Sequence, residues 1–177
     1  DLTAVRQTTG GMNDLLATYS GHNSFGLPAS TTDAAGQTTT YTYNATGQPL
    51  TVTNPLGETT TYTYNGAGQL TTVVGPVSGA TTTMTYDSFG RVRTVTDADG
   101  ATVTTDYDAF DRPTLVTYPD GTTEAFAYQW LDRLASKARL GRVTRYFYDS
   151  LRRPTTIRDP LGRTIVQDWC TCGVLDA

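Results

Sequence analysis

Apolar and polar residues alternate along short segments of the chain, and the same arrangement returns about every 21 residues. In one clear copy, Tyr62 and Tyr64 alternate with threonines, so a strand would carry its rings on one face and its hydroxyls on the other. With Tyr64 as the anchor of its copy, equivalent anchors recur every 20 to 22 residues, at His22, Tyr43, Tyr86, Tyr107, Tyr128, Tyr148 and Trp169. Eight anchors in 177 residues predict a tandem array of structural repeats.

Two turn signals separate the alternating segments of each repeat. One follows the anchor, as in residues 65–68 (NGAG), and the other lies about ten residues further on, as in residues 159–162 (DPLG). An Asn or Asp side chain caps its own turn, and the glycine supplies the positive φ that closes it. The intervening segments are rich in Thr, Tyr and Val, which favour strands. Each repeat is therefore predicted to be a β-hairpin.

The second strand of each hairpin has an irregular apolar spacing. Leu70 and Val73 lie six and nine positions past the Tyr64 anchor, and the same spacing recurs in other repeats. An odd difference cannot keep both side chains on one face of a regular strand, so we expect a bulge or burial on both faces. Residues 129–140 have helical propensity, but the anchors on either side keep the period, so a hairpin is predicted there too.

One turn position departs from its usual residue type. Four positions past the anchor, where Gly47, Gly68 and Gly90 stand in earlier repeats, the chain has Asp111, Asp132 and Arg152. Aspartate tolerates the left-handed conformation at modest cost, whereas Arg152 would be strained unless the turn changes type.

These patterns predict an all-β fold in which tandem hairpins of about 21 residues form one long, twisted antiparallel strip. A sheet of that many strands is expected to coil into a tube or spiral. We divide the chain into a degenerate partial repeat (residues 1–21), an array of about seven units (22–173) and the start of a further repeat (174–177). Because the chain begins and ends inside a repeat, we expect it to be part of a longer array.

The recurring phrases resemble the RHS, or YD, repeat family. Residues 86–91 (YDSFGR) and 159–163 (DPLGR) carry the resemblance best, and it extends over residues 22–173. It implies a β-strip that coils into a hollow shell or tube, as in bacterial toxin complexes, wall-associated proteins and teneurins. It also implies a secreted or cell-surface location, and partnership with further RHS repeats of the same or equivalent chains in a head-to-tail fibre or a shell. Shell-forming members end in a self-cleaving segment and a toxin domain, and nothing after Gly162 resembles either.

Composition and charge narrow the choice of partners. The net charge is -4, and we find no basic cluster in the sequence, which argues against nucleic acid. No segment has the apolar length of a membrane span, and the N-terminus lacks signal-peptide features. Residues 22–90 are nearly uncharged and Thr-rich, whereas 12 of the 13 Lys and Arg residues lie from Arg91 onward. The charged half is interpreted as a solvated surface, and the neutral half as either ordinary surface or a contact or glycan-bearing surface.

Few side chains suggest chemistry. His22 occupies an anchor position, which favours a structural ring over a metal ligand or a catalytic base. Asn44 is a candidate glycan attachment site because residues 44–46 match the acceptor pattern, although they also form an ordinary turn. Cys170 and Cys172 are a candidate disulfide or packing pair, with a disulfide to a partner chain as the alternative. A zinc site would need two further ligands.

No catalytic constellation, cofactor motif or complete metal-ligand set emerges from the sequence, and the aspartates recur at turns. We expect the tyrosine face to form a core rather than to stack on sugars. The prediction is a structural, non-catalytic segment that builds a fibre or shell wall and needs no cofactor or metal. A fragment of a toxin-encapsulating shell and an adhesin or carbohydrate-binding surface are the alternatives.

Overall fold

The computed structural model describes residues 1–9, 12–129 and 133–169, and all their regular structure is β. The strands are short because a turn interrupts the chain about every ten residues. They are β1 (Ala4–Thr9), β2 (Met12–Ser20), β3 (Ser30–Asp33), β4 (Thr38–Tyr43), β5 (Pro49–Thr53), β6 (Thr59–Tyr64), β7 (Leu70–Val74), β8 (Thr81–Tyr86), β9 (Val92–Thr96), β10 (Thr102–Tyr107), β11 (Pro113–Thr117), β12 (Thr123–Gln129), β13 (Arg133–Arg139), β14 (Arg142–Tyr148), β15 (Pro154–Arg158) and β16 (Thr164–Val166).

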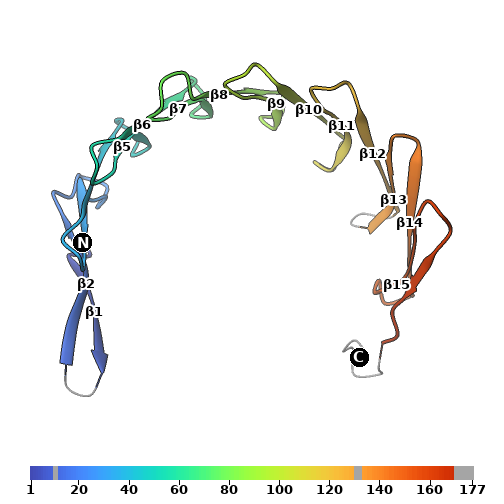
Figure 1. The fold of residues 1–177 in the computed structure, drawn as a ribbon, viewed down its shortest axis with the longest axis horizontal. Helices are drawn as coiled ribbons and strands as arrows, with labels where there is room; N and C mark the ends of the chain where they lie inside the picture. The colour runs from blue at the N-terminus through green and yellow to red at the C-terminus, as the bar shows by residue number, and fades with distance from the viewer. Residues whose placement is uncertain (10–11, 130–132, 170–177) are drawn as a thin grey trace. The chain divides into compact units, whose positions relative to one another are not determined.

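The 16 strands form one sheet in which the spatial order is the order along the chain, from β1 to β16 (Figure 1). Neighbours pair antiparallel, as β4 does with β5 and β5 with β6. The prediction of an all-β array of tandem hairpins is therefore confirmed.

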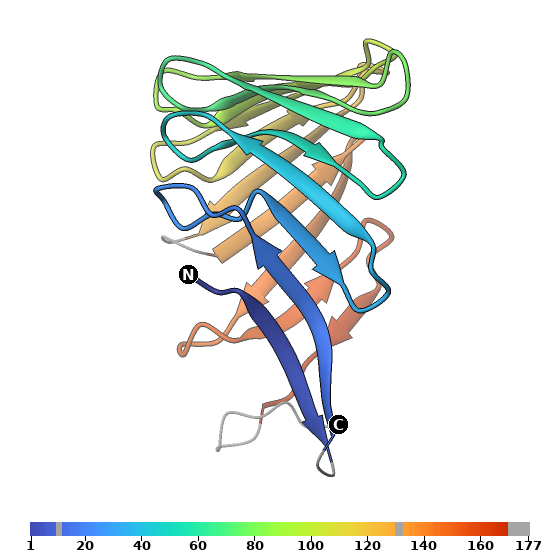
Figure 2. The same ribbon diagram turned by 90° about the vertical axis from the view of Figure 1, so that its left-hand side faces the viewer.

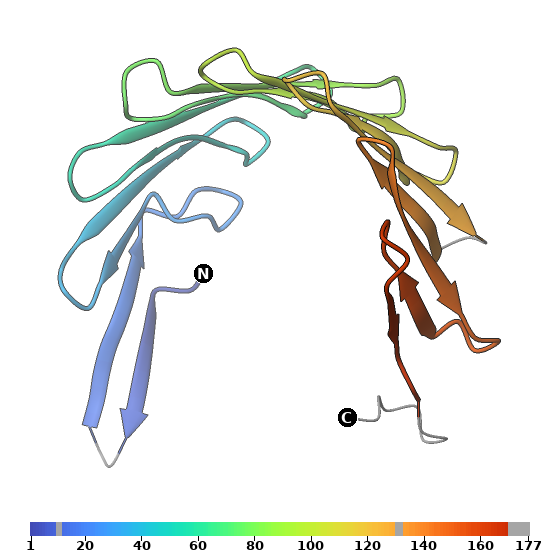
Figure 3. The ribbon, with the colours of Figure 1, turned by 45° about the vertical axis from the view of Figure 1, so that its right-hand side comes forward.

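The chain divides into two compact units, one of residues 1–84 with 97–100 and the other of residues 85–96 with 101–177. In the first unit, drawn blue to green in Figure 2, successive strands are joined by turns at alternate ends. The second unit, drawn yellow to red in Figure 3, has the same hairpin arrangement.

The predicted bulge is present in the hairpin strands that follow the anchors. Tyr62 lies opposite Val73 and Tyr64 opposite Leu70, so Thr71 is the extra residue on the second strand. The bulge brings Leu70 and Val73 to the tyrosine face, which explains their odd spacing. The same register shift immediately precedes the anchors Tyr43, Tyr107, Tyr128 and Tyr148.

The opposite face is lined by hydroxyl groups that pair across neighbouring strands. Their oxygens lie 2.6 to 2.8 Å apart in the pairs Ser20–Ser30, Thr32–Thr38, Thr42–Thr51, Thr53–Thr59, Thr85–Thr94 and Thr96–Thr102. Each hydroxyl is both donor and acceptor, so a pair of them satisfies part of its own hydrogen-bonding capacity without a second layer of protein.

Burial is shallow on both faces of the sheet. In the ranges that the structure describes, no hydrophobic side chain is fully buried, and the buried polar residue is Glu124, at 7% exposure. The expectation that the tyrosine face forms a core is therefore corrected: the anchor rings are half-buried. Because no second layer covers them, they are sheltered by side chains of the same sheet.

The segment with helical propensity, as far as the structure describes it, contains no helix, and residues 130–132 lie outside the described residues. Residues 133–139 form β13, which pairs with β14 through a turn at Leu140 and Gly141, whose φ angles are 50° and 72°. Positive φ at both positions suits the tight hairpin turns that match strand twist. The left-handed turn position is also kept where glycine is absent, since φ is 63° at Asp111 and 67° at Arg152. Arg152 therefore adopts the same left-handed conformation as the glycines of the other repeats, and the turn type is unchanged.

Candidate functional site

In six of the described turns, the residue that follows the anchor shapes the turn with its side chain. In the repeat of Tyr86, Asp87 Oδ1 accepts hydrogen bonds from the backbone N–H groups of Phe89 (2.9 Å) and Arg91 (3.0 Å). The backbone N–H of Gly90 donates to the Asp87 carbonyl at 3.0 Å and closes the turn. The same two side-chain contacts are made by Asn23, Asn44, Asn65, Asp108 and Asp149. These residues shape the backbone, which accounts for their recurrence.

The residue five positions past the anchor holds the capping side chain in one of two ways. In neutral repeats a glutamine accepts from the asparagine amide, as Gln48 Oε1 does from Asn44 Nδ2 at 2.9 Å. In charged repeats an arginine takes this position, and Arg91 Nε donates to Asp87 Oδ2 at 2.7 Å. The ionic version also joins Arg112 to Asp108 and Arg153 to Asp149. Side chains of similar length therefore build the same turn with or without charge.

Hydrogen bonds lower the pKa of two capping aspartates, Asp108 and Asp149. The pKa of Asp108 lies below its usual value chiefly because Arg112 donates to its carboxylate, with partial burial acting in the opposite direction. The pKa of Asp149 is lowered first by the backbone hydrogen bond from Arg153 and then, against partial burial, by the Arg153 side chain. Both carboxylates are therefore stabilised as anions.

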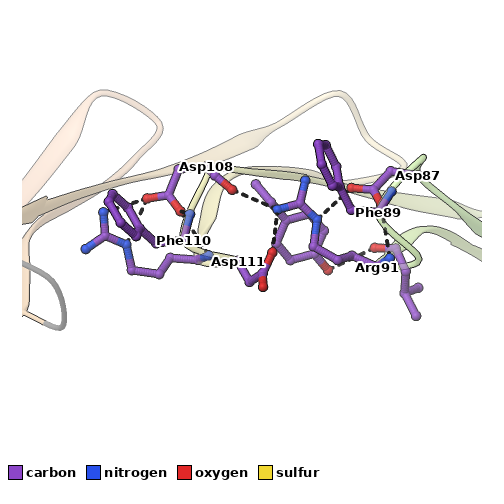
Figure 4. A network of polar contacts seen from close by, with 9 residues as sticks. Asp87, Phe89, Arg91, Asp108, Phe110 and Asp111 are labelled. Atoms are coloured by element: carbon purple, nitrogen blue, oxygen red, sulfur yellow. Dashed lines mark hydrogen bonds and ion pairs between the residues drawn. The ribbon is translucent and has the colours of Figure 1, made fainter.

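The same arginine or glutamine reaches forward to the turn of the next repeat. Arg91 Nη1 donates to the backbone carbonyl of Asp108 at 2.7 Å and to Asp111 Oδ1 at 2.9 Å (Figure 4). In the neutral part of the chain, Gln48 Nε2 donates to the Gly68 carbonyl at 2.7 Å. One side chain thus binds two consecutive turns.

Aromatic rings flank the bridging arginines. The guanidinium carbon of Arg91 lies 5.0 Å from the centroid of the Phe89 ring and 4.8 Å from that of Tyr107. Arg112 lies 5.2 Å from the Phe110 ring and 4.3 Å from the Tyr128 ring. In each case one ring belongs to the same turn and the other is the next anchor. Cation–π attraction of this kind adds to the hydrogen bonds between repeats.

The anchor rings make the reciprocal contact to the repeat before. Tyr64 Oη donates to the Pro49 carbonyl at 2.9 Å, and Pro49 opens the second strand of the preceding hairpin. The donor and acceptor are again 15 residues apart for Tyr43 to Pro28, Tyr107 to Val92, Tyr128 to Pro113 and Trp169 to Pro154. We call this contact, together with the forward contact of the arginine or glutamine, the repeat junction. The repeat junction joins neighbouring repeats, and its polar groups form hydrogen bonds with one another.

The candidate residues from the sequence lie at separate places. His22 directly precedes the turn capped by Asn23, as an anchor should. Asn44 uses its side-chain oxygen and nitrogen within its own turn, and glycan attachment there stays a prediction. Cys170 and Cys172 lie outside the described residues. Within those residues, no group of three His, Cys, Asp or Glu side chains is arranged to hold a metal ion.

Sequence reasoning missed the repeat junction, although two signals for it are present. Gln and Arg share the position five past the anchor, and Phe89 and Phe110 recur three past it, next to the arginines they contact. Neither signal shows that the side chain crosses to the following repeat, because that contact depends on the register of the sheet.

A family model described as RHS Repeat matches residues 22–59, 43–77, 64–102, 86–123 and 131–164. A comparison with curated protein sequences finds no match.

Solved structures with a similar fold include crystal structures of TcdB2-TccC3-Cdc42 and of TcdB2-TccC3, each at 15% identity and a TM-score of 0.65. The matched regions cover 90% and 89% of this chain, respectively, and 11% of the matched chain in each structure. The Photorhabdus luminescens Tc holotoxin pore carrying a TccC3 mutation matches 98% of this chain and 13% of its own, at 14% identity and a TM-score of 0.67. At such identities the likeness shows the fold alone.

Proposed function

The chain belongs to the RHS repeat family, and from this premise we propose that it is a structural, non-catalytic segment of a wall built by a longer array of such repeats. It spans 11% to 13% of the chains that it resembles in structure. We therefore assign its role to the larger assembly of which it would form a part.

The repeat junction is the observation that carries this proposal. At least six of the eight anchors donate a hydrogen bond to the repeat before them, as Tyr64 does, and Gln48 and Arg91 donate to the repeat after them. A hydrogen bond of this type contributes about 1 kcal/mol, so the stability of an array grows with the number of junctions. A strip held together in this way can extend over many repeats without a deep core, as a wall requires.

Further RHS repeats are the partners that fit the ends of the strip. Among the described residues, β1 pairs with β2 and β16 with β15, and neither strand has a second described partner. Unpaired edges recruit strands, and a head-to-tail contact generates either a closed ring or an open filament. A shell wall and a fibre would use the same junctions.

The enclosing shell is favoured over the fibre by one observation. The solved structures with this fold include those of TcdB2-TccC3 assemblies and of a Tc holotoxin pore. We extend the same proposal to the location, as part of a secreted or cell-surface polypeptide. None of the described residues lies in a helix long and apolar enough to cross a membrane.

Electron microscopy of the full-length polypeptide tests the proposal. We expect a continuous β wall, either as closed chambers with density inside or as filaments, and chambers would select the shell. Full-length molecules in which this segment forms no part of a larger β wall would contradict the role. A hydrolytic or transfer activity that maps to residues of the repeat junction would contradict it equally.

A further inference from the structure

Strand pairing gathers cations that are scattered in the sequence. We use the name basic hairpin cluster for Lys137 and Arg139 on β13, Arg142 and Arg145 on β14, and Arg158 on β15. In the register of the sheet Arg139 lies opposite Arg142, and Arg145 lies opposite Arg158. Like charges directly opposite each other on neighbouring strands destabilise a sheet. Because these opposed charges do not stabilise the fold, their presence suggests a role other than folding.

Elsewhere in the described chain, five arginines form ion pairs with carboxylates. Ion pairs join Arg91 to Asp87 and Asp111, Arg93 to Asp106, Arg112 to Asp108, Arg153 to Asp149 and Arg163 to Asp159. Arg142, Arg145 and Arg158 are exposed and have no ion pair with a described residue. They are the members of the cluster that are left for an external anion.

The acidic residues closest to the cluster are already engaged. Glu124 accepts from Lys137 at 2.8 Å and from the hydroxyl of Tyr118 at 3.3 Å. Asp159 accepts from the side chain of Arg163 and from two backbone N–H groups. Neither carboxylate forms an ion pair with Arg142, Arg145 or Arg158, because Glu124 pairs with Lys137 and Asp159 with Arg163.

Two open hollows meet at the tip of this hairpin. One, of about 520 Å³, is lined by Lys137, Arg139, Leu140, Arg142, Thr144 and Pro160. The other, of about 340 Å³, is lined by arginines 142, 145 and 158 together with Asp159 and the turn residues around it. Side-chain alternation places Arg142 and Arg145 on opposite faces of β14, and the two hollows share Arg142 and Pro160 at the hairpin tip. Leu140, which is 69% exposed, places hydrocarbon beside the charged groups.

From this arrangement we propose that the basic hairpin cluster binds an acidic segment of another polypeptide. Carboxylates of that segment pair with Arg142, Arg145 and Arg158, and an apolar side chain packs on Leu140 and Pro160. The planar guanidinium matches a carboxylate with two parallel hydrogen bonds. This proposal is independent of the proposed wall function. The wall function rests on the repeat junctions, which would be the same whether or not the basic hairpin cluster binds a partner.

Two features favour an acidic polypeptide recognised by its side chains. Two rings next to the cluster are already covered by cations, since Arg139 lies 4.8 Å from the Tyr118 ring and Lys137 lies 5.6 Å from that of Phe126. Those two rings are therefore not free to stack on the bases of a nucleic acid. Strands β13 and β14 are paired on both edges, so the partner cannot add to the sheet as a strand.

Calorimetric titration of the 177-residue chain tests the proposal. The probe is a short synthetic peptide of Glu and Leu, and its control has Gln in place of every Glu. We expect saturable binding of the first peptide alone. Arg142→Gln, Arg145→Gln and Arg158→Gln should each weaken it about fivefold or more, as expected for loss of a hydrogen bond to a charged group. Arg6→Gln, which removes an exposed charge on β1, should leave affinity unchanged within about twofold.

Several outcomes overturn the proposal. They are equal binding of both peptides, an equal loss with Arg6→Gln, and tighter binding of a single-stranded oligonucleotide, a sulfated polysaccharide or inorganic phosphate at matched charge. Melting temperatures of the variants provide the second readout. Neutralising Arg145 or Arg158 should leave the melting temperature unchanged or raise it, because the opposed charges disappear, whereas a fall would assign these arginines to folding.

Discussion

The phenolic hydroxyl of Tyr128 donates a 2.7 Å hydrogen bond to the backbone carbonyl of Pro113, which lies 15 residues earlier in the chain. Tyr128 is on β12 and Pro113 opens β11, the second strand of the preceding hairpin. The Tyr128 ring also lies 4.3 Å from the guanidinium of Arg112. One side chain thereby joins two repeats through a hydrogen bond and a cation–π contact.

Removal of this hydroxyl tests whether the repeat junction stabilises the fold. Tyr128→Phe should lower the free energy of unfolding by about 1 to 2 kcal/mol, because the half-buried carbonyl of Pro113 loses its donor. Tyr62→Phe is the matched control, since the Tyr62 hydroxyl has no partner among the described residues. Urea denaturation followed by circular dichroism measures both. Equal losses in the two variants would show that the contact to Pro113 contributes nothing specific.

Acid should weaken the charged repeats. The pKa of Asp108 is lowered in the folded chain, first by the hydrogen bond from Arg112. The stability that this pair contributes is therefore complete above the unfolded pKa of aspartate, about 3.9, and is lost as the pH falls through the lower folded value. Thermal unfolding at a series of pH values should show a melting temperature that is steady near neutrality and falls below about pH 4.

The neutral repeats supply the control for this pH dependence. The double variant Asp108→Asn with Arg112→Gln converts the ionic pair into the pair that Asn44 and Gln48 form naturally. It keeps the side-chain oxygen that caps the turn, so we expect the turn to form and the acid-induced fall to become smaller. An unchanged acid profile in the double variant would mean that other carboxylates govern the response.

Arg152 offers a site for stabilisation. Its φ of 67° is in the left-handed region, where a non-glycine residue is strained by about 1 kcal/mol. Arg152→Gly should therefore raise the free energy of unfolding by about 1 kcal/mol. Arg152→Ala removes the same side chain without relieving the strain and should give no such gain. If the alanine and glycine variants were equally stable, backbone strain would not be the cause.

Lys137 neutralises the most deeply placed carboxylate of the described chain. Glu124 is 7% exposed, and its pKa is lowered chiefly by the hydrogen bond from Lys137. Lys137→Met should lower the free energy of unfolding by about 2 kcal/mol at neutral pH, because it leaves a buried charge without its partner. Adding Glu124→Gln should recover much of that loss in denaturation experiments. A further loss in the double variant would show that the carboxylate has a second essential partner.

The regularity of this chain makes much of its fold readable from the sequence. The spacing of Tyr43, Tyr64 and Tyr86 predicted the hairpins, and the positions of Leu70 and Val73 predicted the bulge that places them beside the anchor rings. Both predictions rest on local physics, because side-chain alternation and turn chemistry act within one repeat. Even Arg133–Arg139, whose composition favours a helix, is a strand, since the repeats on either side impose their period.

Contacts between repeats were decided by the tertiary structure alone. The residue types of Arg91 and Asp111 do not by themselves predict that the two form an ion pair. They meet because antiparallel pairing brings the turns of consecutive repeats to the same end of the strands. The opposition of Arg145 and Arg158 likewise depends on one register, and a shift of a single residue would separate them. The sequence by itself determined the repeating hairpin, because each hairpin is specified by neighbouring residues. The junctions between hairpins and the basic hairpin cluster needed the sheet, because strand register controls which distant side chains come into contact.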